Sequence, residues 1–379
     1  MENVMKLLFC QRNLLMQRDM EETFQRMGIF FRCASYVFSN TDSDDYFCSH
    51  LRHFLTEDCY DAVFSFNFIP LIADVCHEMN VPYISWCYDA GWEFKRLDAL
   101  FYDTNYVFHF DRHACEAYQS YGYPHVFHLP LAVNCNRLDA LPCTPDILLQ
   151  YRSDISFVGS LYEQYNQSLP SIFRTLNPQE QTALLNYIDN QSEFYTDHAL
   201  WDVLNPDVVP DVLTRLALIA ACSGIIAGRQ RKVMLERVSH EFPLTLYTTS
   251  SADILPKADY RWRASYYSQM PFIFRHSTIN LNLTIPSIQS GLPLRILDVL
   301  GSGGFLLTNP QPELSDYFTL GKDLDTFSSL DELCEKLSFY TAHPDIASRL
   351  AANGHAVVKD AFSFEQQFQK IAKISGLPL

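Results

Sequence analysis

Strand and helix signals alternate along the first 134 residues, and this alternation limits the fold more than any other feature. Short apolar runs are followed in turn by stretches with a helical spacing of apolar residues. The pattern predicts βαβ units, and therefore a parallel sheet with helices on both faces. The expected strands are Lys6–Cys10, Phe30–Phe38, Ala62–Phe66, Val81–Cys87, Tyr106–Phe110 and His125–Leu129, and the expected helices are Leu14–Gly28, Asp44–Asp58, Ile69–Met79 and Arg112–Tyr121.

The alternation returns after Leu138–Asp146, whose two prolines indicate a linker. Residues 163–240 have mainly helical patterning. Beyond the linker we expect the strands Asp154–Gly159, Leu244–Tyr247, Thr278–Leu283 and Phe305–Thr308, a helix after Pro293, and the helices Leu330–Ala342, Asp345–Ala361 and Ser363–Ile374.

A chain of 379 residues is also long enough for two domains. The sequence predicts two doubly wound α/β domains, residues 1–137 and 150–362, facing across a cleft. Residues 363–379 form a C-terminal helix that can pack back on the first domain. Ligands of such sheets bind at the carboxyl ends of the strands.

Charge and cysteine usage narrow the functional class. The net charge is −16, from 44 acidic and 28 basic residues, which disfavours nucleic acid and anionic membranes as partners. The eleven cysteines form no C-x-x-C pair, as is typical of a reducing cytosol, and no apolar run approaches the roughly 20 residues of a membrane helix. We therefore expect a cytoplasmic protein without an integral membrane segment.

The segment Asn280–Asn309 indicates a buried strand, a loop, a short helix, a glycine break and a second strand. The loop Ser290-Gly291-Leu292-Pro293 offers N–H groups at a positive helix end, where a diphosphate can bind. Arg295 would add a charge-assisted contact, and Asp298 can hold a ribose. The alternative is an ordinary helix start, with Arg295 on a solvated face and Asp298 as an ordinary acidic residue of the helix. The glycines expected to allow a tight helix-to-strand turn are Gly301, Gly303 and Gly304.

Several stretches carry a family resemblance: Tyr267–Phe274, Ile279–Thr284, Ser287–Asp298, Gly301–Asn309 and Pro312-Glu313-Leu314, with Trp86–Ala90 and His128–Val133 in the first half. Through them the chain resembles the bacterial CgeB-like glycosyltransferases. The resemblance implies a GT-B fold, two Rossmann-like domains in which the C-terminal one holds the donor nucleotide and the N-terminal one faces the acceptor.

The chain departs from this pattern in its charges. Many GT-B enzymes carry two glutamates where this chain has Ser290 and Asp298, so the donor sugar and the stereochemistry cannot be carried over. Gly159 and Ser160 follow the first strand of the second domain and are expected to face the donor phosphates. A basic residue often follows this glycine in GT-B proteins, but here Ser160 follows it. The candidates for that basic role are Arg229, Arg231, Lys232, Arg261 and Arg263. Tyr247 and Thr248, at a strand end, are predicted to contact the nucleobase or simply to end the strand.

Asp89 follows an apolar strand at the predicted acceptor edge, with Trp86, Tyr88 and Trp92 beside it. Such a carboxylate can act as a general base toward an acceptor hydroxyl, and the aromatic rings can stack on a sugar. The equally plain alternative is a turn residue at a strand end. Asn67 is a weaker candidate of the same kind.

No metal or cofactor is expected. The D-x-D in Asp42-Ser43-Asp44-Asp45 precedes a predicted helix, where capping explains the acids better than metal binding.

The sequence thus predicts a metal-independent glycosyltransferase that moves a sugar from a nucleotide-sugar donor to a glycan, protein or small-molecule acceptor. If the reaction inverts, Asp89 is the expected base; for a retaining reaction no nucleophile is identified. The alternatives are a catalytically silent nucleotide- or glycan-binding protein and a nucleotide-sugar epimerase.

Overall fold

The computed structural model describes residues 5–11, 15–35, 43–90, 96–165, 171–191, 200, 203–205 and 207–379. The chain divides into two compact units. Unit 1 comprises residues 1–132 and 362–379, and unit 2 comprises residues 133–361. Some predicted positions lie outside the described residues, namely Leu14, residues 36–38, Asp42 and Trp92.

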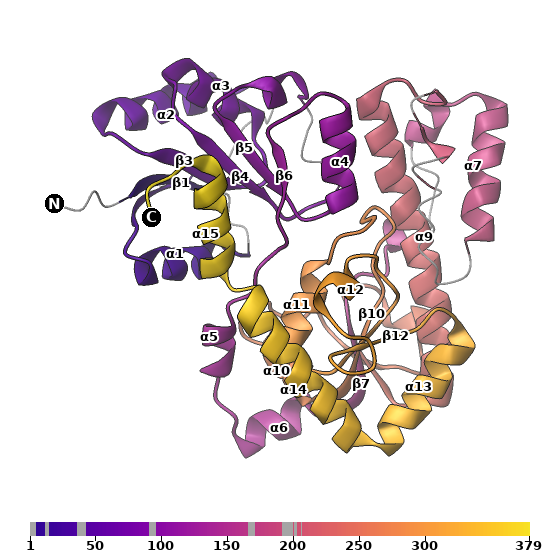
Figure 1. The fold of residues 1–379 in the computed structure, drawn as a ribbon. Coiled ribbons are helices and arrows are strands. Elements are labelled where there is room, and N and C mark those ends of the chain that lie inside the picture. The colour runs from indigo at the N-terminus through magenta and orange to yellow at the C-terminus, as the bar shows by residue number, and fades with distance from the viewer. Residues whose placement is uncertain are drawn as a thin grey trace. The chain divides into compact units, whose positions relative to one another are not determined.

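Unit 1 is built on a sheet of six parallel strands in the order β2-β1-β3-β4-β5-β6 (Figure 1). The central strands β3 and β4 are buried along their whole length, as expected for a sheet covered on both faces. The strands are β1 (Lys6–Gln11), β2 (Phe30–Ser35), β3 (Ala62–Phe66), β4 (Tyr83–Cys87), β5 (Asn105–His109) and β6 (Val126–His128).

Helices cover both faces of this sheet. One face packs against α2 (Asp45–Glu57), α3 (Pro70–Met79) and α4 (Arg112–Ser120) in a single apolar cluster. The other face carries α1 (Gln17–Arg26) and the last helix, α15 (Phe364–Ser375). There the rings of Phe24 and Phe368 meet each other and the strand residue Phe64. The C-terminal helix is therefore part of the unit 1 core.

Unit 2 has a second all-parallel sheet, in the order β12-β11-β10-β7-β8-β9. Its strands are β7 (Ser153–Val158), β8 (Leu244–Tyr247), β9 (Asp259–Arg261), β10 (Ser277–Asn282), β11 (Leu306–Thr308) and β12 (Asp325–Thr326). One face packs against α9 (Val212–Glu241), α13 (Leu330–Ala342) and α14 (Pro344–Ala361). The helices α10 (Met270–His276) and α11 (Leu294–Gly301) follow β9 and β10 along the chain and contact each other.

A smaller helical core extends unit 2. The first half of α9 packs against α7 (Pro178–Asn190) and the short 3-10 turn η3 (Ser171–Thr175) through apolar side chains. Among the described residues, further short elements of unit 2 are η2 (Glu163–Tyr165), η4 (Ala252–Ile254) and α12 (Leu314–Tyr317), and unit 1 contains the 3-10 turn η1 (Asp98–Phe101).

The predicted linker Leu138–Asp146 is wrong in part, because helix α5 (Cys135–Asp139) enters it at one end and helix α6 (Pro145–Tyr151) at the other, which leaves residues 140–144 between the two helices. The Asn134 side chain caps α5, and the Thr144 hydroxyl caps α6. Pro145 takes the first turn of α6, where the N–H that proline lacks would have no partner. The proline therefore begins a helix here instead of breaking one.

The turn between α11 and β11 depends on two glycines. Gly303 has φ of +78°, a backbone region that favours glycine. A Cβ on Gly304 would lie 2.4 Å from the Phe274 carbonyl oxygen. The predicted tight turn is confirmed, and it brings β11 alongside β10.

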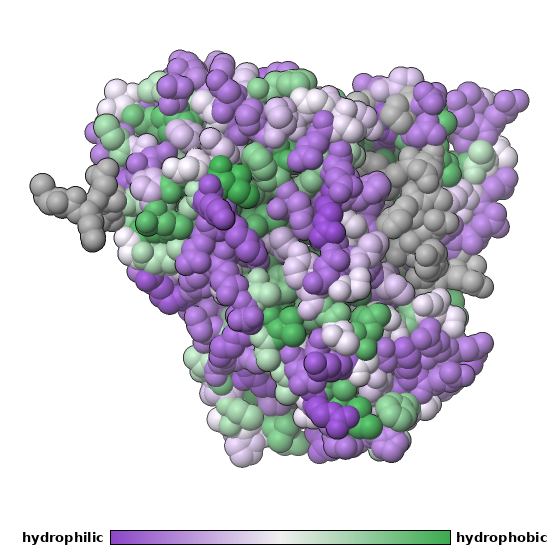
Figure 2. All heavy atoms as spheres, in the orientation of Figure 1, coloured by the Kyte–Doolittle hydropathy of each residue, from purple (hydrophilic) through white to green (hydrophobic). Residues whose placement is uncertain are grey.

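On the face shown in Figure 2, hydrophilic residues cover much of the surface and hydrophobic residues lie between them. No helix among the described residues combines the length and apolar character that a membrane crossing requires.

Candidate functional site

The sheet of unit 2 has a topological switch point between β7 and β10. From β7 the chain winds outward through β8 and β9, and it then returns to β10 on the other side of β7. Open parallel sheets bind ligands beyond the carboxyl ends of the strands at such a point. Arg231, on α9, spans it: one guanidinium nitrogen donates to the Ser160 carbonyl at 2.8 Å, and the other donates to the Leu283 carbonyl at 2.6 Å.

The Arg231 side chain is buried and its charge is not neutralised. It has no carboxylate partner among the described residues, and its Nε is buried without a hydrogen bond. The guanidinium lies over the rings of Phe157 and Tyr162. Burial lowers the pKa of Arg231; the Tyr162 phenol opposes this shift, and the nearby positive charge of Arg295 adds to it. This is a costly arrangement for a cation unless an anion joins it.

Arg231 stands out among the five basic candidates. Arg229 pairs with Asp189, and Arg261 pairs with Asp259. Lys232 and Arg263 are exposed. The structure thus places one of the five at the switch point, a choice that the sequence left open.

The loop before α11 offers unsatisfied donors. The N–H groups of Gly291, Leu292 and Leu294 donate no hydrogen bond within the described part of the chain, and no side chain caps the helix. The loop is tied down by Glu313: its N–H donates to the Ser290 carbonyl at 3.1 Å, and its carboxylate accepts from the Ser290 hydroxyl at 2.7 Å. Sequence reasoning included Glu313 in a stretch that carries the resemblance but gave it no role; the residue is 2% exposed.

Arg295 and Asp298 lie together on α11. Their side chains form an ion pair at 3.3 Å, and the Arg295 guanidinium lies over the Phe274 ring. Tyr266 donates its hydroxyl to the Asp298 carboxylate at 2.9 Å. Asp298 is buried, at 7% exposure, so these partners help to hold its charge. Tyr266 carries no motif that would have identified it from the sequence.

The remaining predicted donor residues gather at the carboxyl ends of β7 and β8. The Gly159 N–H donates to the Tyr247 carbonyl at 3.0 Å, so these two strand ends are adjacent. Ser160 follows directly and accepts from Arg231. Thr248 is buried, and its hydroxyl accepts the Ser250 N–H at 3.2 Å. The structure therefore brings Gly159, Ser160, Tyr247 and Thr248 to one sheet edge.

In unit 1, Asp89 and Asn67 lie together beyond the carboxyl ends of β4 and β3. The Asn67 amide donates to the Asp89 carboxylate at 2.6 Å, and its carbonyl oxygen accepts the N–H groups of Tyr88 and Asp89. Asn67 adopts a left-handed backbone with φ of +58°. Asp89 is exposed, which is the geometry of an oriented carboxylate that remains reachable from solvent.

The expectation that Trp86 stacks on a sugar is wrong. Trp86 is 0% exposed and packs against Phe66, Tyr88 and Phe364 in the core of unit 1. Both faces of the sheet are covered at β4, so side chains on either side of this strand, including Trp86, are buried in the core.

Asp44, in the acidic run before α2, acts as the helix cap. The Asp44 carboxylate accepts the Phe47 N–H at 2.9 Å, as the capping interpretation predicts. Within the described ranges, no three His, Cys, Asp or Glu side chains gather where they could hold a metal ion.

Comparisons with known proteins identify one matching family and several solved structures with a similar architecture. Residues 229–373 match the model of a family described as glycosyl transferase-like. A glycosyltransferase from Rickettsia africae has a TM-score of 0.62 at 10% identity, with 98% of each chain covered. Sucrose-phosphate synthase from Thermosynechococcus elongatus has a TM-score of 0.60 at 8% identity, again with 98% of each chain covered. HepE from Anabaena, in complex with UDP and glucose, has a TM-score of 0.58 at 8% identity, with 98% of this chain and 99% of HepE covered. No curated protein matches the chain in sequence.

These similarities, with two six-stranded parallel sheets, confirm the predicted GT-B fold of two Rossmann-like domains. The second half of the chain carries a glycosyl transferase-like domain.

Proposed function

We propose that the chain is a glycosyltransferase that takes its sugar from a nucleoside diphosphate sugar and requires no metal ion. The observation that carries this proposal is the buried guanidinium of Arg231, which spans the switch point of the unit 2 sheet and has no carboxylate partner in the part of the chain that the structure describes. A bound diphosphate would provide the missing counter-charge. The narrower assignment to the CgeB-like enzymes is part of the proposal.

The donor would be held by two kinds of groups in unit 2. Arg231 and Arg295 supply positive charge, and the N–H groups of Gly291 and Leu292 supply donors at a helix start. Groups fixed in this way stabilise the negative charge that builds on the departing diphosphate, which a metal ion does in other enzymes. Asp298, held by Tyr266, would accept hydrogen bonds from the ribose. Because HepE was solved with UDP and glucose, UDP-linked sugars are the first donors to test.

The transfer itself needs one proton acceptor if it inverts the sugar. The bond between the sugar C1 and the diphosphate oxygen breaks, and its electron pair stays on the diphosphate. The acceptor oxygen forms the new bond to C1, and its proton passes to the Asp89 carboxylate, which Asn67 orients. A glycan, a protein or a small molecule can supply the hydroxyl.

The test is a calorimetric titration of UDP into the wild type and Arg231→Met, in EDTA and in magnesium. Charge-assisted hydrogen bonds contribute about 1.5–3 kcal/mol, so we expect Arg231→Met to bind UDP roughly 10- to 150-fold more weakly. The matched control is Arg229→Met, which removes an exposed, paired arginine two positions away. It should bind UDP normally.

Arg231→Lys is a second variant that keeps the positive charge. The melting temperatures of both variants, compared with that of the wild type, show whether either variant has a folding defect. Wild-type affinity in both Arg231 variants would contradict the phosphate role. UDP binding that appears only with magnesium would contradict metal independence.

A catalytically silent nucleotide-binding protein is the second candidate. It is favoured by the internal partners of two predicted site groups: the Ser290 hydroxyl is bonded to Glu313, and Asp298 is bonded to Tyr266 and Arg295. Release of UDP from a UDP-sugar, whether by transfer or by slow hydrolysis, would exclude this candidate.

A further inference from the structure

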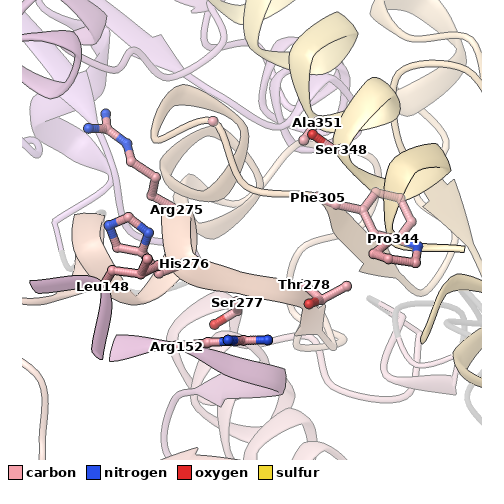
Figure 3. Close-up of a pocket in the computed structure, with 11 residues that line it drawn as sticks. Leu148, Arg152, Arg275, His276, Ser277, Thr278, Phe305, Pro344, Ser348 and Ala351 are labelled. Carbon is pink, nitrogen blue, oxygen red and sulfur yellow. The ribbon is translucent and has the colours of Figure 1, made fainter. Parts of the chain in front are cut away.

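Unit 2 contains a cavity of about 310 Å³ at the amino ends of β10 and β11 (Figure 3). Ser277 and Thr278 begin β10, whereas Arg231 binds the Leu283 carbonyl beyond the other end of the same strand. The cavity is therefore at the sheet edge opposite the proposed donor site. Its lining comes from α6, α10, α14 and the starts of the two strands.

The charged side chains that line this cavity are all basic. They are Arg152 and Arg275, although the chain as a whole has 44 acidic and 28 basic residues. Arg275 donates to the carbonyls of Ser302 and Leu138, at 3.1 and 2.6 Å. In the part of the chain that the structure describes, neither guanidinium has a carboxylate partner. The cavity is thus a locally positive site in an acidic protein.

One buried hydrogen-bonding atom at the cavity has no partner. Nε2 of His276 makes no hydrogen bond to any described residue, and burial together with the nearby Arg275 charge lowers the pKa of this histidine. The half-buried Thr278 hydroxyl also faces this space, and the Arg152 guanidinium and the Ser348 hydroxyl, at its rim, are exposed to solvent. A buried polar atom without a partner often marks a place where water or a ligand binds.

The lining combines polar and apolar side chains. Arg152 lies beside Ser277, and the Arg275 guanidinium points away from Thr278 and Phe305 (Figure 3). The apolar walls are Phe305, Leu148, Pro344 and Ala351. A volume at the lower end of the usual range for ligand pockets suits a ligand with one ring and one charged group.

We propose that this cavity binds a small organic anion, with its phosphate or carboxylate on Arg152 and its carbon body against Phe305 and Leu148. Arginine suits both anions because its planar fork donates two parallel hydrogen bonds. The His276 Nε2 and the Thr278 hydroxyl, on adjacent elements, would complete the polar contacts. The site is distinct from the donor site, so it does not depend on the proposed transferase activity.

The test uses phenyl phosphate and benzoate as probes, titrated calorimetrically into the full chain at constant ionic strength. We expect at least one probe to bind the wild type, and Arg152→Gln to weaken that probe at least tenfold. Arg349→Gln is the matched control, because it removes an exposed arginine of α14 that does not line the cavity. It should change the affinity less than twofold.

Two further arms locate the site. Ser348→Trp places a large side chain at an exposed lining position and should abolish binding while the melting temperature stays at the wild-type value. Saturating UDP should leave probe affinity unchanged. The proposal is overturned if neither probe binds at millimolar concentration, if Arg152→Gln binds as the wild type does, or if UDP displaces the probe. The stronger of the two probes identifies the charged group as phosphate or carboxylate.

Discussion

The carboxyl edges of the two sheets carry opposite chemistry on the same kind of scaffold. In unit 2 the edge presents the guanidinium groups of Arg231 and Arg295 and the N–H groups of the loop at Gly291, which donate to no described residue. In unit 1 the corresponding edge presents the exposed carboxylate of Asp89, oriented by Asn67. Parallel topology determines where loops gather, and the few residues after each strand determine what can bind there.

This difference suggests a division of labour. The positive edge suits a diphosphate, and the carboxylate edge suits removal of a proton from a neutral hydroxyl. If that division holds, changes in unit 1 should alter turnover and leave nucleotide affinity alone, whereas changes in unit 2 should alter nucleotide affinity.

The largest effect is expected from Asp89→Asn. General-base catalysis contributes about 10²- to 10⁴-fold, so kcat for sugar transfer should fall by that factor. The UDP dissociation constant should not change, because Asp89 belongs to the unit 1 edge. Steady-state kinetics and a UDP titration on the same preparation measure both quantities.

The control for Asp89 is Asp103→Asn, which makes the same chemical change at a highly exposed turn before β5, at the amino edge of the same sheet. It should keep wild-type kcat. A normal kcat in Asp89→Asn would show that Asp89 is not the general base, and it would contradict the proposed division of labour between the two units.

A smaller effect is expected from Asp298→Asn, on affinity. A ribose hydroxyl would lose a charged acceptor, worth about 1.5 kcal/mol or roughly tenfold in the UDP dissociation constant. Comparison with 2′-deoxy-UDP sharpens the test. The wild type should prefer UDP, and the variant should lose most of that preference.

Tyr266→Phe is the partner variant for Asp298, because it removes the hydroxyl that donates to this carboxylate. It should weaken UDP binding less than Asp298→Asn does. An unchanged preference for UDP over 2′-deoxy-UDP in Asp298→Asn would show that the carboxylate serves only the Arg295 ion pair.

Much of the fold is readable in the sequence because buried parallel strands are apolar runs. The helix Leu330–Ala342 was predicted with the bounds that the structure has, and the strand Ala62–Phe66 likewise. The short edge strands β9 and β12 were missed, since strands of three and two residues leave no periodic signal. The predicted linker Leu138–Asp146 extends too far toward the C-terminus, because Pro145 begins α6.

The site was less predictable, because its groups come together only through packing. Gly291 and Asp298 follow recognisable sequence patterns. Arg231 is one of several cations on or near a long helix, and only the crossing of α9 over the switch point distinguishes it. Glu313 meets Ser290 across 23 positions, a contact that no local spacing encodes.

The smallest effect is expected from Asn67→Gly, which tests whether Asn67 positions Asp89 or only forms a turn. Glycine tolerates the left-handed backbone at φ of +58°, so the fold should persist. The variant loses the amide hydrogen bond to the Asp89 carboxylate and the two that the amide oxygen accepts from the N–H groups of Tyr88 and Asp89. At this exposed position the bond to the carboxylate is worth about 0.5–1 kcal/mol, which predicts roughly a threefold fall in kcat. Asn80→Gly is a matched control, since Asn80 has φ of +52° at the end of α3. A fall in kcat for Asn67→Gly alone would assign the effect to its amide, whereas equal kcat in both variants would reduce Asn67 to a turn residue and leave Asp89 oriented by other means.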